Sequence, residues 1–197
     1  MSVSSLSLMK IGMMQSGGVA PFDPEAGLTL SRTLAISSTH PGSDFGKDSN
    51  STVLAMDFTG LDGSSGGMIY EFGGSGTGVY AGFRANGDVM VRAGRGTDPV
   101  DVNTAYVLLN GGHTTVSGTG TLVVEFNRLP VLQTRVWWNG NELGSPVDAA
   151  TNYAIAGNND GGIFVIGGAN AVLGEVTAPV IYSTCSGLRV YENQLVS

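Results

Sequence analysis

Glycine recurs every few residues along this chain and accounts for 31 of its 197 residues. A glycine inside a helix costs about 1 kcal/mol relative to alanine, so this spacing leaves little room for a long helix. The longest run without glycine covers residues 121–139, and it contains Pro130, which interrupts a helix as well. We therefore expect short strands separated by glycine turns.

The clearest strand pattern lies in residues 67–94, where apolar side chains alternate with other residues in three successive sets. These sets are Met68, Tyr70 and Phe72; Val79, Ala81 and Phe83; and Val89, Val91 and Ala93. Successive side chains of a strand point to opposite faces, so the three sets are predicted to line one buried face of a meander. Asn86-Gly87 between the last two sets is typical of a tight hairpin turn with positive φ at both residues.

Similar patterns predict further strands in residues 28–36, 51–59, 121–128, 134–138, 163–166 and 187–195, with a turn at Asn139-Gly140. Many short strands around one core predict an all-β fold, an antiparallel two-sheet jelly-roll sandwich. Residues 1–20 are polar and weakly patterned, so we expect an extended N-terminal arm there and the sandwich domain in residues 21–197.

The charge balance bears on the partners of the chain. The net charge is −7 and no Lys/Arg cluster occurs, which argues against nucleic acid as a partner. No apolar run approaches the roughly 20 residues of a membrane span, so no membrane partner is expected. The single cysteine, Cys185, rules out an internal disulfide and is expected to be a small buried apolar residue. Residues 1–14 do not resemble a signal peptide.

The order of the predicted strands adds a resemblance to a known family. The segments that carry it are Arg135-Val136-Trp137-Trp138-Asn139-Gly140, Phe164-Val165-Ile166-Gly167-Gly168 and the closing stretch from Ser186 to Leu195. They resemble the laminin-G-like, concanavalin A-like lectin/glucanase sandwich family over roughly residues 28–197. The resemblance implies the sandwich fold, and its members include lectins, adhesion modules, glycoside hydrolases and virion proteins.

The hydrolase branch needs a pair of carboxylates close together on one strand face. The glutamates of this chain stand isolated in the sequence, at Glu25, Glu71, Glu125, Glu142, Glu175 and Glu192. We therefore expect no catalytic residues and a protein that is not an enzyme.

Calcium is the one cofactor that the resemblance leaves open, because sandwich rims of this family often hold it through loop carboxylates. The candidate ligands are Asp57, Asp62 and Asp160, with Asp98 and Asp101 in a further loop. No Asp-x-Asp-x-Asp series occurs, and acids at turns are explained equally by solvation. We expect no cofactor, with a calcium ion as the alternative.

The aromatic residues supply the candidate binding surface. Strand alternation places Trp138 in the core with Val136 and leaves Trp137 on the outer face beside Arg135, and Tyr80 is likewise predicted to point outward. An exposed Trp137 can stack on a sugar ring or anchor a protein interface, whereas the alternative is that a neighbouring loop covers it. Trp137, Arg135 and Tyr80 are the predicted binding residues.

Three functions fit these expectations. The main prediction is a capsid decoration (cement) protein on the virion surface, made in the host cytoplasm, which binds the major capsid protein and forms a homo-oligomer, with a trimer expected. The first alternative is a lectin-like carbohydrate-binding module, or a tail-associated receptor-binding protein, with glycans as partners. The second alternative is an adhesion domain of a cell-surface protein.

Overall fold

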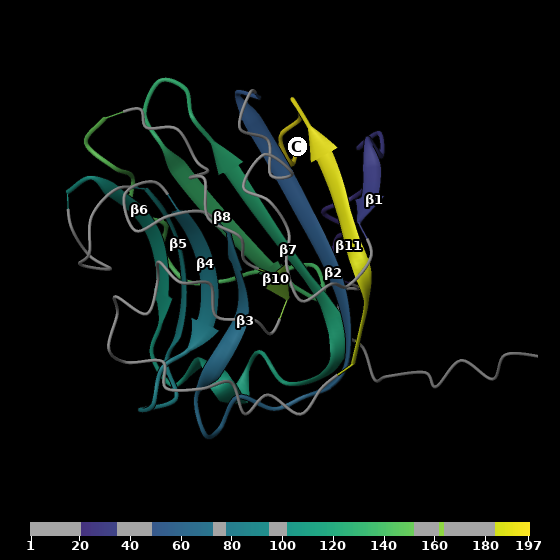
Figure 1. Ribbon diagram of the computed structural model, residues 1–197, viewed down its shortest axis with the longest axis vertical. Coiled ribbons are helices and arrows are strands. Elements are labelled where there is room, and N and C mark those ends of the chain that lie inside the picture. The colour runs from purple at the N-terminus through teal and green to yellow at the C-terminus, as the bar shows by residue number, and fades with distance from the viewer. Residues whose placement is uncertain (1–20, 35–48, 73–77, 95–101, 152–161, 164–183) are drawn as a thin grey trace, which may run out of the picture.

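The computed structural model describes residues 21–34, 49–72, 78–94, 102–151, 162–163 and 184–197 (Figure 1). Across these residues every regular element is a strand, apart from one short 3-10 helix, η2 (Gly112–Thr114). The predicted all-β class is therefore confirmed. The predicted N-terminal arm lies outside the described residues, so the domain boundary at residue 20 stays a prediction. In the described part of the chain, no helix is long and apolar enough to span a membrane.

One sheet has six strands, all paired antiparallel, in the spatial order β1-β11-β2-β7-β8-β9. Their bounds are β1 (Arg32–Leu34), β2 (Ser51–Leu61), β7 (Gly118–Asn127), β8 (Gln133–Trp138), β9 (Asn141–Glu142) and β11 (Thr184–Glu192). The long strand β2 lies between two strands that come much later in the chain. Strand β1, near the start of the described residues, lies beside β11, near their end (Figure 1).

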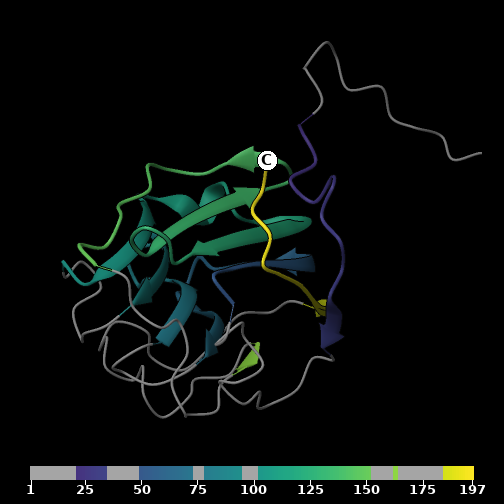
Figure 2. The ribbon, with the colours of Figure 1, turned by 90° about the horizontal axis from the view of Figure 1, so that it is seen from above.

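The second sheet has five antiparallel strands in the order β10-β3-β4-β5-β6. Their bounds are β3 (Gly67–Phe72), β4 (Gly78–Phe83), β5 (Val89–Gly94), β6 (Thr104–Leu109) and β10 (Gly162–Ile163). After β2 the chain crosses to this sheet for β3 to β6 and returns to the six-stranded sheet for β7 to β9. It then crosses once more for β10 and returns for β11. The two sheets lie face to face as layers (Figure 2).

The main core fills the space between the two sheets. The inward residues of each strand alternate along it, as in Leu54, Met56 and Phe58 of β2, and all three are buried. The predicted inward residues Trp138 and Val136 belong to this core. Burial of apolar surface at about 25 cal/mol per Å² is the main force that holds the layers together.

The predicted meander is present as β3, β4 and β5, with two local differences. Met68 lies on the outer face, because the register shifts between Met68 and Tyr70 and the extra residue reverses the side on which Met68 points. At the Asn86-Gly87 turn only Gly87 has positive φ, at 85°. Instead, the Gly87 N–H donates a hydrogen bond to the Arg84 carbonyl, and the Arg84 N–H donates one to the Asp88 carbonyl. These two hydrogen bonds close a turn that ends in a glycine bulge.

Tyr80 points to the outer face of the five-stranded sheet, as predicted, and is covered there. Its side chain is only 3% exposed and packs with Met68 and Met90 on the same face. All six residues of β4 are buried, so this sheet is covered on both faces. A buried tyrosine offers no ring face to a ligand, and its role in binding stays a prediction without structural support.

Candidate ligand-binding site

The outer face of the six-stranded sheet carries a second, smaller apolar cluster. Its members are Val53, Ala55, Val123, Trp137, Tyr191 and Val196, with Leu28 packed against them. Ala55, Val123 and Trp137 are neighbours across β2, β7 and β8 because their registers coincide. Two segments from opposite ends of the described chain cover this row: residues 21–31, here called the N-terminal segment, and residues 193–197, here called the C-terminal tail.

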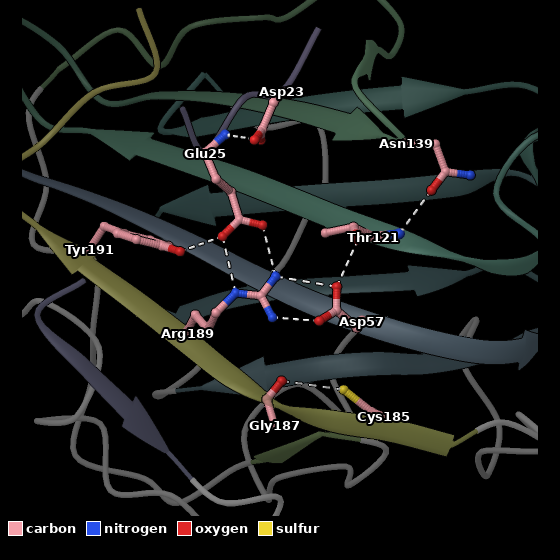
Figure 3. Close-up of polar contacts among 9 residues, drawn as sticks. All are labelled: Asp23, Glu25, Asp57, Thr121, Asn139, Cys185, Gly187, Arg189 and Tyr191. Atoms are coloured by element: carbon pink, nitrogen blue, oxygen red, sulfur yellow. Dashed lines mark hydrogen bonds and ion pairs between the residues drawn. The ribbon is translucent and has the colours of Figure 1, made fainter. Parts of the chain in front are cut away.

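The N-terminal segment begins with a compact turn. The Asp23 side chain accepts a hydrogen bond from the Glu25 backbone at 2.9 Å, and the Ala26 N–H donates to the Asp23 carbonyl at 3.1 Å. Short side chains that accept such local bonds stabilise turns of this kind. The turn projects the Glu25 side chain toward the sheet (Figure 3).

Further along, the N-terminal segment is joined to the C-terminal tail. The Thr29 N–H donates to the Gln194 side chain at 2.6 Å, and the Gln194 amide donates back to the Thr29 carbonyl at 2.7 Å. The Ser31 N–H then donates a hydrogen bond to the Val190 carbonyl at 3.0 Å, and the chain continues into β1 beside β11. The side chain of Gln194 therefore acts as a substitute for a strand partner.

Glu25 ends in a polar cluster on β2 and β11, which we call the Glu25 clamp and which consists of Glu25, Arg189, Asp57 and Tyr191 (Figure 3). Arg189 donates to both Glu25 oxygens, at 2.7 and 3.0 Å, and to both Asp57 oxygens, at 3.2 and 2.5 Å. Tyr191 donates its hydroxyl proton to Glu25 as well. Fork-shaped bonds of this type are the strong ones, because both partners carry charge.

The contacts within the clamp shift the pKa values of Arg189, Asp57 and Tyr191. The hydrogen bonds that Arg189 donates to Glu25, and then those to Asp57, raise the pKa of Arg189, so it stays charged. The hydrogen bond from Arg189 lowers the pKa of Asp57 against the opposing effect of burial. Burial, followed by the hydrogen bond to Glu25, raises the pKa of Tyr191 to about 12. At neutral pH Asp57 is therefore a carboxylate, Arg189 a guanidinium and Tyr191 a neutral phenol.

The turn between β8 and β9 approaches the N-terminal segment closely. Asn139 and Gly140 both have positive φ, at 50° and 79°, which confirms the hairpin turn predicted from their sequence. A side chain at Gly140 would come within 2.0 Å of the Phe22 carbonyl oxygen, so only glycine permits this approach. Asn139 folds back over Gly120 and accepts a hydrogen bond from the Thr121 backbone at 2.9 Å.

A pocket of about 170 Å³ lies where these parts meet. Its lining comes from the N-terminal segment, from β7 and from the β8–β9 turn: Phe22, Asp23, Pro24, Glu25, Thr121, Val123, Asn139 and Gly140. Pockets that enclose drug-sized ligands measure about 300 Å³ or more, so this pocket fits one small ring of a larger ligand.

Two polar groups of the lining have no partner among the residues that the structure describes. Asp23 uses one carboxylate oxygen for the Glu25 backbone, which leaves the other without a partner. Asn139 uses its oxygen for the Thr121 N–H, and since a backbone N–H only donates, the outer atom of this amide is the nitrogen. The pocket therefore offers one free acceptor and one free donor.

An apolar surface completes the pocket. The side chain of Phe22 is 48% exposed and meets the ring of Trp137 edge to face, with 6.5 Å between centroids. Val123 and Pro24 add aliphatic surface. A pocket with an aromatic ring, a free carboxylate oxygen and a free amide is chemically suited to a ligand that has both hydroxyl groups and apolar C–H surface.

The sequence-predicted binding residues on β8 lie close by but differently from expected. Trp137 is on the outer face, as predicted, yet it is 1% exposed because Phe22 and the apolar cluster cover it. Arg135 lies 4.9 Å above the Trp137 ring and forms a two-bond ion pair with Glu142, at 2.8 Å for each bond. The expected exposure of Trp137 is therefore wrong, and the covering anticipated as the alternative is what occurs.

Of the three predicted calcium ligands, the two that lie in the described residues, Asp57 and Asp62, each have another partner. Asp57 is neutralised by Arg189, and Asp62 is a surface acid that accepts the Ser64 N–H at 2.9 Å. Asp160 lies outside the described residues, as do Asp98 and Asp101. Within the described ranges, no three His, Cys, Asp or Glu side chains gather in a way that could hold a metal ion.

The sequence reasoning missed the residues that form the pocket. Phe22 and Asp23 lie at the start of the predicted sandwich domain, in a stretch without strand alternation. For Arg189, the sequence predicts only a place in the closing strand. The one local signal is Asp23-Pro24-Glu25, an acid before a proline, which is typical of a turn. This turn contacts β7 and β8 in the tertiary structure, and no pattern in the sequence predicts those contacts.

Comparisons with known proteins support the fold. No family model matches the chain, and no curated protein matches it. Similar solved structures include the IT-sialidase CBM40 of Ruminococcus gnavus (14% identity, TM-score 0.50, 86% of this chain and 94% of that chain). A leech intramolecular trans-sialidase complexed with 2,7-anhydro-Neu5Ac is also similar (15% identity, TM-score 0.51, 86% of this chain and 26% of that chain).

The binding domain of botulinum neurotoxin serotype G is a third similar structure (8% identity, TM-score 0.51, 75% of this chain and 34% of that chain). At such low identities the likeness concerns the fold alone. The sheet topology and these neighbours together confirm the predicted jelly-roll sandwich of the concanavalin A-like kind.

Proposed function

We propose that the protein is a non-catalytic, lectin-like carbohydrate-binding module whose sugar site is the pocket between the N-terminal segment and the β8–β9 turn. One observation carries the proposal: the pocket places a free carboxylate oxygen of Asp23 and a free amide group of Asn139 beside the half-exposed ring of Phe22. This was the alternative, not the main, function predicted from the sequence.

The chemistry of a sugar ring fits this combination. Each sugar hydroxyl both donates and accepts, so it can donate to Asp23 and accept from Asn139. Sugar rings also carry a C–H face that packs on an aromatic ring, as the Phe22 ring allows. The pocket holds one ring, which suits recognition of a terminal residue with the remaining glycan in solvent.

The fold supports a binding role in a general way. The Ruminococcus gnavus CBM40 and the leech trans-sialidase complexed with 2,7-anhydro-Neu5Ac share the sandwich at a TM-score of at least 0.50. Their ligands do not transfer to this chain at 14% and 15% identity. The proposal therefore depends on the pocket and not on the neighbours.

Catalysis is not part of the proposal. A general acid needs a raised pKa, whereas the hydrogen bond from Arg189 lowers the pKa of Asp57. Burial raises the pKa of the Cys185 thiol, which disfavours the thiolate that a nucleophile requires. The thiol is half-buried and donates to the Gly187 carbonyl at 3.7 Å (Figure 3).

Asn139→Asp tests the site with little structural change. Aspartate keeps the acceptor for the Thr121 N–H and tolerates positive φ, but it replaces the free donor with a second acceptor. We expect binding on a glycan array and in calorimetry to fall at least about tenfold, which is the effect of one lost hydrogen bond to a ligand hydroxyl.

Asn193→Asp is the matched control. Asn193 also has positive φ, at 57°, and its side chain also accepts a backbone N–H, from Asn50 at 3.2 Å, but it lies outside the pocket. Equal binding by both variants and the original protein would reject this pocket as the site. An original protein that binds no glycan would reject the function.

The capsid decoration role, its trimer and its virion location stay predictions from sequence. The three similar structures named above are not virion proteins, and no observation on the described residues favours a capsid contact over a glycan. Mass spectrometry of purified virions would test that role directly, since a decoration protein must sediment with the particles.

A further inference from the structure

We infer that the pocket prefers sugars with a protonated amine, accepts neutral sugars and discriminates against sugars with a carboxylate. This inference rests on the proposed function and specifies the class of sugar. It comes from the charges in and around the pocket, which are negative on balance.

The lining itself contains two carboxylates, Asp23 and Glu25, and none of its residues is a lysine or arginine. Behind it lies the Glu25 clamp, where, among the described residues, Arg189 is the one cation that pairs with Glu25 and Asp57. Three carboxylates against one guanidinium leave two net negative charges at this end of the sheet. The next ionised pair on this face, Arg135 with Glu142, is neutral as a pair.

Arg189 is not available to bind an anionic sugar. A guanidinium has five N–H groups. Four of those of Arg189 are used, two for Glu25 and two for Asp57. A sugar carboxylate would have to displace one of these protein carboxylates, and the displaced group would lose its charged partner. The remaining polar donor in the pocket is the neutral Asn139 amide.

Asp23 is the residue that sets this preference. Its second oxygen has no partner in the described part of the chain, and no ion pair there compensates its charge, in contrast to that of Glu25. At a distance of about 5 Å in a partly hydrated site, one unit charge changes the affinity for a charged ligand by roughly three- to tenfold. The effect decreases with salt, because the pocket is open to solvent.

The experiment compares three chemical forms of one ring. Glucose, glucosamine and glucuronate are titrated by calorimetry or NMR at low ionic strength and mildly acidic pH, and the galactose and mannose series are treated in the same way. In any series that binds, we expect the amine form to bind about three- to tenfold more tightly than the neutral form, and the carboxylate form to bind weaker by a similar factor.

Asp23→Asn removes the charge and keeps the oxygen that accepts the Glu25 N–H, so the turn is preserved. We expect this variant to reduce both differences to less than about twofold, because the comparison is made among the three sugar forms on the same variant, whatever its affinity for the neutral sugar. Asp62→Asn is the matched control, since Asp62 accepts the Ser64 N–H in a similar turn at the same 2.9 Å and lies outside the pocket. It should leave both differences unchanged.

The outcomes separate the inference from the function on which it rests. Carboxylated sugars that bind as well as or better than neutral ones overturn the inference and leave the proposed function intact. Differences that persist in Asp23→Asn also overturn it, because another charge then controls the preference. An original protein that binds no sugar in any form overturns both proposals.

Discussion

Glu25 and Arg189 form a two-bond ion pair across the outer face of the six-stranded sheet, at 2.7 and 3.0 Å, although they are 164 residues apart in the chain (Figure 3). Arg189 simultaneously binds Asp57 of β2, so one guanidinium links the N-terminal segment to the strand at the centre of the sheet. The pair thereby positions one wall of the candidate pocket and the cover of Trp137.

Arg189→Met should lower the free energy of unfolding by about 1–3 kcal/mol, measured by urea denaturation. The variant leaves Glu25 and Asp57 partly buried and without their shared cation, which is costly. Arg135→Met is the comparison, because it breaks the more exposed pair with Glu142 and should cost less than about 1 kcal/mol. Equal losses in the two variants would show that the clamp adds no more stability than a surface ion pair.

Tyr191 should make the protein less stable at alkaline pH. The folded state raises its pKa to about 12, whereas an unfolded tyrosine has a pKa near about 10. The proton is thus held more tightly in the folded state, so the stabilisation is complete below about pH 10 and is lost as pH rises through about 12. Urea unfolding over this range should show a decline that Tyr191→Phe reduces and that Tyr106→Phe, on the other sheet, leaves unchanged. Burial also raises the pKa of Tyr70, so the part of the decline that remains in Tyr191→Phe is expected from that residue. A decline of the same size in Tyr191→Phe would assign it to another group.

Gly140→Ala should detach the N-terminal segment from the β8–β9 turn. The new methyl group would lie 2.0 Å from the Phe22 carbonyl, and the backbone there cannot yield without moving the segment. We expect Trp137 to become exposed, with a shift of its fluorescence to longer wavelength, and the proposed sugar binding to be lost.

Gly118→Ala separates this clash from backbone strain. Gly118 has the same φ of 79°, but a side chain there meets nothing within 4 Å, so only the cost of about 1–2 kcal/mol for a left-handed conformation remains. The Gly118 variant should therefore lose stability without a change in tryptophan emission. Matching emission spectra in the two variants would mean that the close contact at Phe22 does not hold the segment in place.

Local patterns predicted the local structure well. The alternation in β4 and β5 and the turn at Asn139-Gly140 depend on neighbours within a few residues, and both are as expected. The bulge at Met68 was not predictable, because it depends on how β3 pairs with β4. Strand β6 was not predicted either. Its apolar alternation is short, and its residues are buried because β6 pairs with β5.

The sequence by itself determined the class of fold. Away from the bulge at Met68, it also determined the side of the sheet on which the residues of the predicted strands lie, including the outer position of Trp137, because strand geometry alternates with a period of two. Only the tertiary structure decided whether that outer face meets solvent. Residues 21–31 and 193–197 cover Trp137 and build the pocket through contacts such as Glu25 with Arg189 and Thr29 with Gln194. Contacts between residues so far apart in the sequence depend on how the whole chain folds, and no local pattern encodes them.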